Sequence, residues 1–271
     1  MKIFFKTLIV TLFASAFVSC TLDVQDEFDF KPEIVDNDPF ENQTAWQFIE
    51  ARTSNSLLDA RGRRTLNQIN GENLDYMAAA IRRVGYEALY NQTANPNRTY
   101  FLLNNNAFTG GSPRDVGRIT TGRNAPTRAN VDDYFANFTD EQLNRLKAVL
   151  RYHIVDQFVD QIELFPTREV NKLFPTLLRR VDVDAAGMAT LSQLPSQISI
   201  LRDIRLRLIL NRQDALLPET AIGPGLNETV RVHNFVFNNG IGHFINDTVR
   251  FQDYALYSDI DLDELDELDE L

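Results

Sequence analysis

Hydrophobic residues recur at helical spacing in two segments of the first half of the chain. Residues 73–90 carry an apolar stripe that ends at Gly85, as amphipathic helices often do. That stripe is formed by Leu74, Met77, Ala78, Ile81 and Val84. Residues 138–156 contain the clearest helix, because Thr139 and Gln142 have the spacing of a capping box. Its apolar stripe is formed by Leu143, Leu146, Val149 and Leu150.

Farther along, hydrophobic and polar residues alternate with the period of a β-strand. Residues 203–210 place Ile204, Leu206, Leu208 and Leu210 against Arg205 and Arg207. Residues 228–237 and 242–251 alternate in the same way. Helices first and strands later predict an α+β domain.

Charge is distributed unevenly along the 271 residues, and this sets the expected domain boundaries. The formal charge is −11, yet residues 42–258 hold 22 acidic and 24 basic residues. The acidity therefore belongs to residues 21–41, expected to be a tether, and to residues 259–271, expected to be a tail. We expect one folded domain over residues 42–258 and no nucleic-acid partner, because the net charge repels phosphate.

The first twenty residues have the pattern of an export signal, with Lys2 and Lys6 before an apolar run over residues 7–18. Two endings fit: an A-x-A cleavage site at residues 14–16, and "FVSC", which resembles the bacterial lipobox. Cys20 is the single cysteine of the chain. The lipobox predicts that Cys20 is lipidated and anchors the mature protein to a membrane, whereas the other ending leaves Cys20 as a free thiol.

Residues 109–130 are rich in glycine and arginine and resemble no phosphate-binding loop. A connection of this length is either functional or disordered. We therefore expect an insertion whose four arginines bind an acidic protein surface or an anionic glycan, with a solvated flexible loop as the alternative. The four are Arg114, Arg118, Arg123 and Arg128.

Three histidines raise the question of metal or acid–base chemistry. They stand at His153, His233 and His243, with no pair at the spacing typical of zinc ligands. His243 shares a predicted strand face with Ile245, Val249 and Phe251, and His153 follows an apolar helix stripe, so both are expected in the core. No nucleophile motif is present. We therefore predict no catalytic residue, no metal site and no cofactor, and a metal-dependent hydrolase ranks last among the hypotheses.

Three segments in order resemble the boxes of the fasciclin (FAS1) domain family. They read "TYFLLNNNAF" at residues 99–108, "LRYHIV" at residues 150–155 and "NNGIGHFIND" at residues 238–247. Leu103 replaces the proline usual in the first box. The resemblance implies a fasciclin-like α+β fold, with a β-sandwich-like core and helices packed at one side. It also assigns core roles to five box residues, which are Tyr152, His153, Asn239, Gly240 and His243.

The same resemblance implies a function in adhesion or in binding a protein or glycan, without catalysis. Lipid-anchored bacterial members accompany outer-membrane nutrient transporters of the starch-utilisation type and their lipoprotein lids. We therefore expect an accessory of such a complex, anchored in the outer membrane and facing the cell exterior. The alternative is a purely structural subunit that contacts a TonB-dependent transporter without binding ligand. Thr248 lies in a short motif, "DTV", that fits O-glycosylation in such bacteria.

Overall fold

The computed structural model describes residues 40–54, 73–126, 131–161, 171–203, 205, 207–212, 227–249 and 253–262. The predicted signal, Cys20 and nearly all of the predicted tether lie outside the described residues, as do Arg128, Ile204, Leu206 and most of the acidic tail. The statements below concern the described residues.

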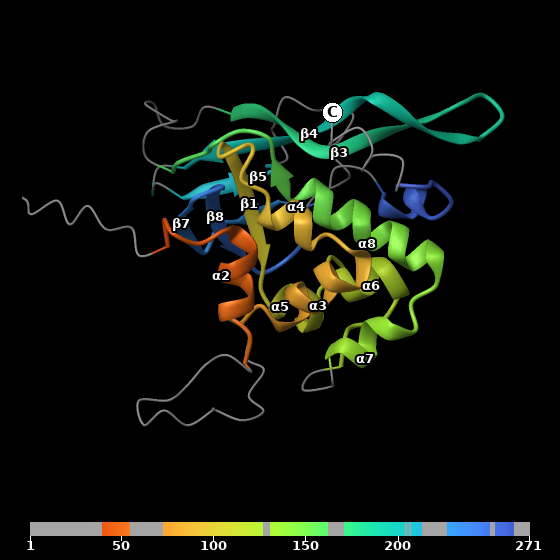
Figure 1. The fold of residues 1–271 in the computed structure, drawn as a ribbon. Helices are drawn as coiled ribbons and strands as arrows, with labels where there is room; N and C mark the ends of the chain where they lie inside the picture. The colour runs from red at the N-terminus through yellow and green to blue at the C-terminus, as the bar shows by residue number, and fades with distance from the viewer. Residues whose placement is uncertain are drawn as a thin grey trace, which may run out of the picture. The chain divides into compact units, whose positions relative to one another are not determined.

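The helices lie together along one side of the sheet (Figure 1). They are α2 (Ala45–Ala51), α3 (Asp75–Val84), α4 (Glu87–Asn91), α5 (Asn106–Thr109), α6 (Val116–Thr121), α7 (Val131–Ala136), α8 (Asp140–Tyr152) and the 3₁₀ helix η1 (Tyr254–Tyr257). The capping box predicted for α8 is present, with Thr139 and Gln142 exchanging side-chain and backbone hydrogen bonds. Thr44 and Gln47 cap α2 in the same way. Helix α3 ends at Gly85, whose φ of 76° is left-handed and suits glycine.

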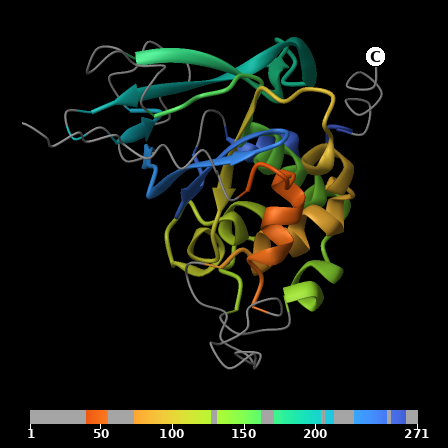
Figure 2. The ribbon, with the colours of Figure 1, turned by 60° about the vertical axis from the view of Figure 1, so that its left-hand side comes forward.

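Eight strands form one continuous sheet that curls (Figure 2). They are β1 (Arg98–Leu103), β2 (Ile154–Val155), β3 (Asn171–Val183), β4 (Ala189–Arg202), β5 (Leu208–Leu210), β6 (Glu228–Thr229), β7 (Val232–Phe237) and β8 (Gly240–Ile245). Their order across the sheet is β6-β5-β4-β3-β2-β1-β8-β7. Strands β1 and β8 run parallel, and the other neighbours are antiparallel. The predicted α+β class is confirmed, and the sandwich-like core is enclosed by one curled sheet and its helices.

The C-terminal strands are shorter than the alternating patterns predicted. Strand β5 covers Leu208–Leu210, and Arg207 lies outside it because Asp203 accepts hydrogen bonds from its backbone and side chain. Strand β8 stops at Ile245, so Val249 does not continue it. All six residues of β8 are buried, so the strand is covered on both faces.

The described part of the predicted insertion, residues 109–126, contains regular structure. Helix α6 forms within them and ends at Gly122, whose φ is 75°. Asp115, Val116, Thr120 and Ala125 are buried. Val116 and Thr120 lie on one face of the helix and, with Ala125 beyond its end, attach the segment to the core.

The packed core extends beyond residues 42–258 at both ends. Phe40, placed in the predicted tether, packs edge-to-face on Phe48 and Phe235 with ring centroids 5.0 and 5.8 Å apart. Ile260 and Leu262, placed in the predicted acidic tail, are buried. Isolated apolar residues inside acidic segments therefore belong to the folded body.

Candidate functional site

Tyr152 and His153 lie at the end of α8 with both side chains buried. The Tyr152 hydroxyl donates to the carbonyl of Gln197 at 3.1 Å and accepts from the Asn211 amide at 2.8 Å. His153 Nδ1 lies 2.7 Å from the carbonyl oxygen of Val149, and its Nε2 accepts from the Val249 backbone N–H at 3.0 Å. Because a carbonyl can only accept, Nδ1 carries the proton. His153 is thus a neutral ring that joins α8 to the segment after β8.

His243 is also a neutral ring held by two backbone hydrogen bonds, but its proton is on Nε2 and not on Nδ1. Its Nε2 lies 2.9 Å from the carbonyl oxygen of Val159 and donates to it, and its Nδ1 accepts from the Asn234 N–H at 3.2 Å. Asn234 has a φ of 62° and sits at an irregularity of the β7–β8 pairing, which turns its N–H toward the ring. The ring also lies against Phe101, with centroids 5.8 Å apart.

Burial keeps both of these histidines uncharged at neutral pH. Loss of water around the ring lowers the pKa of His153 to about 4, although the hydrogen bond to Val149 opposes the shift. The pKa of His243 is likewise lowered to about 4, with burial as the largest cause. All four ring nitrogens are engaged with backbone groups, so neither ring has a free nitrogen for a metal or a substrate. The third histidine, His233, is exposed on β7.

Asn239 lies in the turn that precedes β8, and Gly240 is the first residue of that strand. The Asn239 side chain accepts from the Ala45 N–H and donates to the Tyr90 carbonyl, both at 2.9 Å, and so joins α2 to α4. Gly240 has a φ of 144°, and a Cβ there would lie 2.1 Å from the Arg98 carbonyl oxygen. Only glycine permits this approach of β8 to β1. The five box residues therefore meet in one buried framework, and no reactive pair is formed among them.

Arg114 is part of an ion-pair cluster beneath the surface. Its guanidinium lies 3.1 Å from Asp247 and 3.5 Å from Glu228, and it donates to the Asn227 carbonyl. The prediction that Arg114 contacts a ligand conflicts with this geometry, because its side chain is occupied and mostly buried. It holds together the loop before α6, strand β6 and the end of β8.

Asp115, the next residue in the chain, is a further buried carboxylate. Its Oδ2 accepts from the Gly111 N–H at 2.6 Å, and no hydrogen-bond partner for Oδ1 is found among the described residues. Burial, with the charge of Asp247 as a smaller cause, raises the pKa of Asp115 to about 6. Burial also raises the pKa of Glu228 to about 7, against the effect of Arg114. Within the described ranges no group of three or more His, Cys, Asp or Glu residues is arranged to hold a metal ion.

The remaining arginines of residues 109–130 differ from Arg114. Arg118 and Arg123 are exposed on α6 and the turn after it, and Arg118 Nε donates to the Asn124 side chain. Arg128 lies outside the described residues. Two of the four predicted binding residues are thus exposed at the surface, five residues apart along the chain.

Thr248 is not accessible for modification in the folded domain. Its side chain is buried, and its hydroxyl donates to the Arg114 carbonyl at 2.5 Å. The segment around it is not a strand, contrary to the prediction. A glycosyltransferase would need this region unfolded to reach the hydroxyl.

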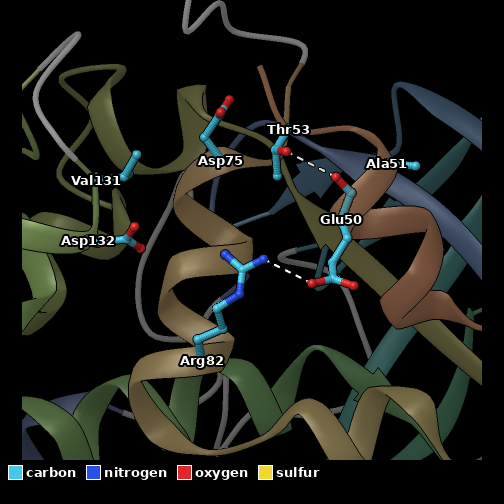
Figure 3. A pocket seen from close by; sticks show the side chains of 7 residues that line it. All are labelled: Glu50, Ala51, Thr53, Asp75, Arg82, Val131 and Asp132. Carbon is cyan, nitrogen blue, oxygen red and sulfur yellow. Dashed lines mark hydrogen bonds and ion pairs between the residues drawn. The ribbon is translucent and has the colours of Figure 1, made fainter. Parts of the chain in front are cut away.

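One surface pocket of about 420 Å³ lies between α2, α3 and the start of α7 (Figure 3). It is lined by Glu50, Ala51, Thr53, Asp75, Arg82, Val131 and Asp132. Arg82 pairs with Glu50 at 2.9 Å, and the Asp75 carboxylate accepts from Ser54 and Asn105. Small-molecule sites are usually lined mainly by apolar groups with a few unpaired polar ones. This pocket has the opposite character, so it is a weak candidate for a ligand site.

The ion-pair cluster around Arg114 could not be found from sequence patterns. The carboxylates that pair with Arg114 come from positions 228 and 247, which no local motif connects to it. Of the described helices, none has the length and hydrophobicity needed to cross a bilayer. The predicted lipid anchor at Cys20 lies outside the described residues and stays a prediction.

Comparisons with known proteins find similarity among solved structures. No family model matches the chain, and no curated protein matches it. The chain is similar to the solved structure of a FAS1 domain pair from the insect cell adhesion molecule fasciclin I, with 11% sequence identity and a TM-score of 0.44. The likeness covers 80% of this chain and 53% of that one, so this chain spans about half the length of the similar structure. A likeness at this level adds nothing to what the residues themselves indicate about function.

Proposed function

We propose that the chain is a non-enzymatic, lipid-anchored surface protein whose fasciclin-like domain binds a protein or glycan as an accessory of an outer-membrane nutrient-uptake complex. One observation supports the binding role above others. His153 and His243 were the residues that most suggested metal or acid–base chemistry. Every ring nitrogen of both makes a hydrogen bond to the backbone inside the core. The three sequence boxes then serve the fold, and the function lies on the surface.

The surface proposed for binding is centred on Arg118 and Arg123. Both are exposed and project from a segment that Val116, Thr120 and Ala125 fix to the core. A guanidinium group presents several donors in one plane and recognises carboxylates and sulfates in pairs of hydrogen bonds. The ligand class is therefore an anionic glycan or an acidic protein surface.

The predicted lipid anchor supports a location at the membrane surface. "FVSC" at residues 17–20 fits a lipobox, and the acidic residues after it suit an extended tether. A second candidate, a structural subunit that contacts a TonB-dependent transporter, gains support from the long β3–β4 hairpin, which projects from the sheet (Figure 1). In that case mild detergent extraction should co-purify a transporter and its lipoprotein lid.

Retention on immobilised polysaccharides tests the binding role. The chain with Cys20→Ala should be retained on a polyuronate or sulfated glycan and released by salt, because the contacts are ionic. The Arg118→Ala, Arg123→Ala double variant should elute at markedly lower salt.

The matched control is Arg205→Ala, Arg231→Ala, which removes the same charge from two other exposed arginines. If the control elutes as early as the test variant, retention reflects net charge alone and the proposed surface is wrong. If no polysaccharide retains the unmodified surface, glycan binding is refuted, and an acidic protein ligand remains to be tested by the same pair of variants.

A further inference from the structure

The C-terminal part of the described chain is fixed to the helices, close to α6. Ser258 accepts two hydrogen bonds from α8: the Asn144 side chain donates to its carbonyl at 3.3 Å, and Arg145 Nε donates to its hydroxyl at 2.7 Å. Helix η1, just before Ser258, packs against both α8 and α6. Leu262, the last described residue, is buried. The chain therefore leaves the described body within a few residues of a contact with the helix that carries Arg118.

The residues that follow are strongly acidic. Residues 263–271 read "DELDELDEL", with six acidic residues and no basic one. We call them the acidic segment, and they lie outside the described residues. Nine residues reach up to about 30 Å when extended, whereas a six-residue helix such as α6 is about 9 Å long. The whole of α6 is therefore within reach of the acidic segment of the same chain.

Arg118 and Arg123 present positive charge within that reach. Both are exposed, and Arg118 Nε donates to the Asn124 side chain. Among the described residues no carboxylate forms an ion pair with either guanidinium. Two other arginines of this region differ, because Arg114 pairs with two carboxylates and Arg145 donates to a hydroxyl. The acidic segment and this pair of arginines are thus complementary in charge.

The attachment of the acidic segment makes weak ionic contacts sufficient. Each exposed ion pair changes an equilibrium constant by a factor of only roughly 1.4 to 5. A segment joined to the same body by a short connection is present at an effective concentration on the order of millimolar. Adjacent aspartate and glutamate side chains also offer paired carboxylates, which suit the planar donors of a guanidinium group.

We propose that the acidic segment docks on Arg118 and Arg123 of its own chain and competes there with the anionic ligand. The inference rests on the proposed function for the identity of the ligand, whereas the docking itself needs no ligand. A ligand must displace the segment before it can bind. Ligands with a high density of negative charge are therefore selected over those with isolated charges.

Carbodiimide crosslinking tests the docking directly. The chain carrying Cys20→Ala, Arg118→Lys and Arg123→Lys keeps both positive charges, and carbodiimide joins a lysine amine to a carboxylate in contact with it. Mass spectrometry of the monomeric product should find amide links from position 118 or 123 to acidic residues among 263–270. The matched control is Arg205→Lys, at another exposed arginine, and it should form no such link.

Calorimetric titration with soluble dextran sulfate tests the competition. Changing Glu264, Glu267 and Glu270 together to glutamine halves the charge of the acidic segment. Three lost ion pairs weaken docking about threefold or more, so the dissociation constant of dextran sulfate should fall by about twofold or more.

The matched control removes three negative charges elsewhere, through Glu41→Gln, Glu87→Gln and Asp182→Asn. These side chains are exposed or partly exposed. The control should have a much smaller effect on the dissociation constant, because only the charge of the whole chain changes. An unchanged urea midpoint confirms that each variant is folded.

The outcomes separate this inference from the proposed function. Absence of links from positions 118 and 123, equal links from position 205, or links only between two copies would overturn the docking. An equal gain in affinity in the control would overturn the competition, since net charge would then explain it. If dextran sulfate does not bind at all, glycan binding fails, and the crosslinks still decide the docking. If it binds and the crosslinks are missing, the docking fails and the proposed function stands.

Discussion

Acid should destabilise the domain through its two buried histidines, and replacing one of them isolates the effect. The pKa of His153 is lowered from 6.5 to about 4 by burial. A group whose pKa is lowered on folding contributes stability that is fully present above its unfolded pKa and is lost as pH falls toward its folded pKa. From pH 7 to pH 5 this amounts to about 2 kcal/mol of the free energy of unfolding for each of His153 and His243.

The carboxylates of Asp115 and Glu228 act in the opposite direction over the same pH range. The raised pKa values of Asp115 and Glu228 make the folded state bind protons more tightly than the unfolded state, so their contribution grows on acidification. The stability of the unmodified chain alone is therefore a poor test. The difference between the chain and its His153→Phe variant cancels the carboxylates and leaves the histidine.

The His153→Phe variant should be less stable at pH 7 by about 2–4 kcal/mol, because the Val149 carbonyl and the Val249 N–H lose their partner. Phenylalanine cannot titrate, so the gap should narrow by about 2 kcal/mol at pH 5. Urea unfolding at pH 5, 6, 7 and 8 measures this difference in the free energy of unfolding, with both proteins carrying Cys20→Ala. Met188→Gln, at an exposed position without a titratable group, is the control and should show a constant gap. A gap for His153→Phe that stays constant or widens toward pH 5 would refute the reasoning.

Three further outcomes follow from the same structure. Gly240→Ala should lower the free energy of unfolding by about 3 kcal/mol or more, because its Cβ would meet the Arg98 carbonyl. Gly85 also has a positive φ but has open space around it, so Gly85→Ala should lower that free energy by about 1 kcal/mol. Equal losses in thermal or urea unfolding would contradict this. The stability of Glu228→Gln relative to the unmodified chain should rise by about 2 kcal/mol between pH 5 and pH 7. The raised pKa of Glu228 gives the unmodified chain a contribution to stability that is fully present below pH 4.5 and is lost as pH rises through 7. A pH-independent difference in unfolding free energy would disprove the role of the cluster. Arg114→Ala should destabilise by about 3 kcal/mol because Asp247 and Glu228 lose their cation, and Arg118→Ala should change stability by less than about 0.5 kcal/mol, which the same unfolding curves would show.

Local signals in the sequence were sufficient for the helices that matter most. The capping box at Thr139 and the stripe after it placed α8, and Gly85 marked the end of α3. Those features depend on residues three or four positions apart, which a single sequence displays. The burial of His153 and His243 could be predicted for the same reason, from the apolar residues next to each.

What the sequence could not supply was contact between distant segments. The partners of His243 are Val159 and Asn234, and those of Arg114 are Glu228 and Asp247, so no window of residues shows them together. Composition misrepresented residues 109–130, because glycine and arginine concealed the few buried side chains that attach α6. The β3–β4 hairpin was not predicted; its strands contain Pro175 and Pro195, which are uncommon within paired strands, and the hairpin accommodates both at its register shifts or beside them.

The most direct test of the central claim is the location of the folded body on intact cells. Antibody raised against the body should label unbroken cells that make the full chain, and Cys20→Ala should move the protein from the membrane fraction to the soluble fraction and remove the label. Labelling that appears only after cells are broken, or continued membrane attachment of the Cys20→Ala variant, would contradict a lipid-anchored surface protein.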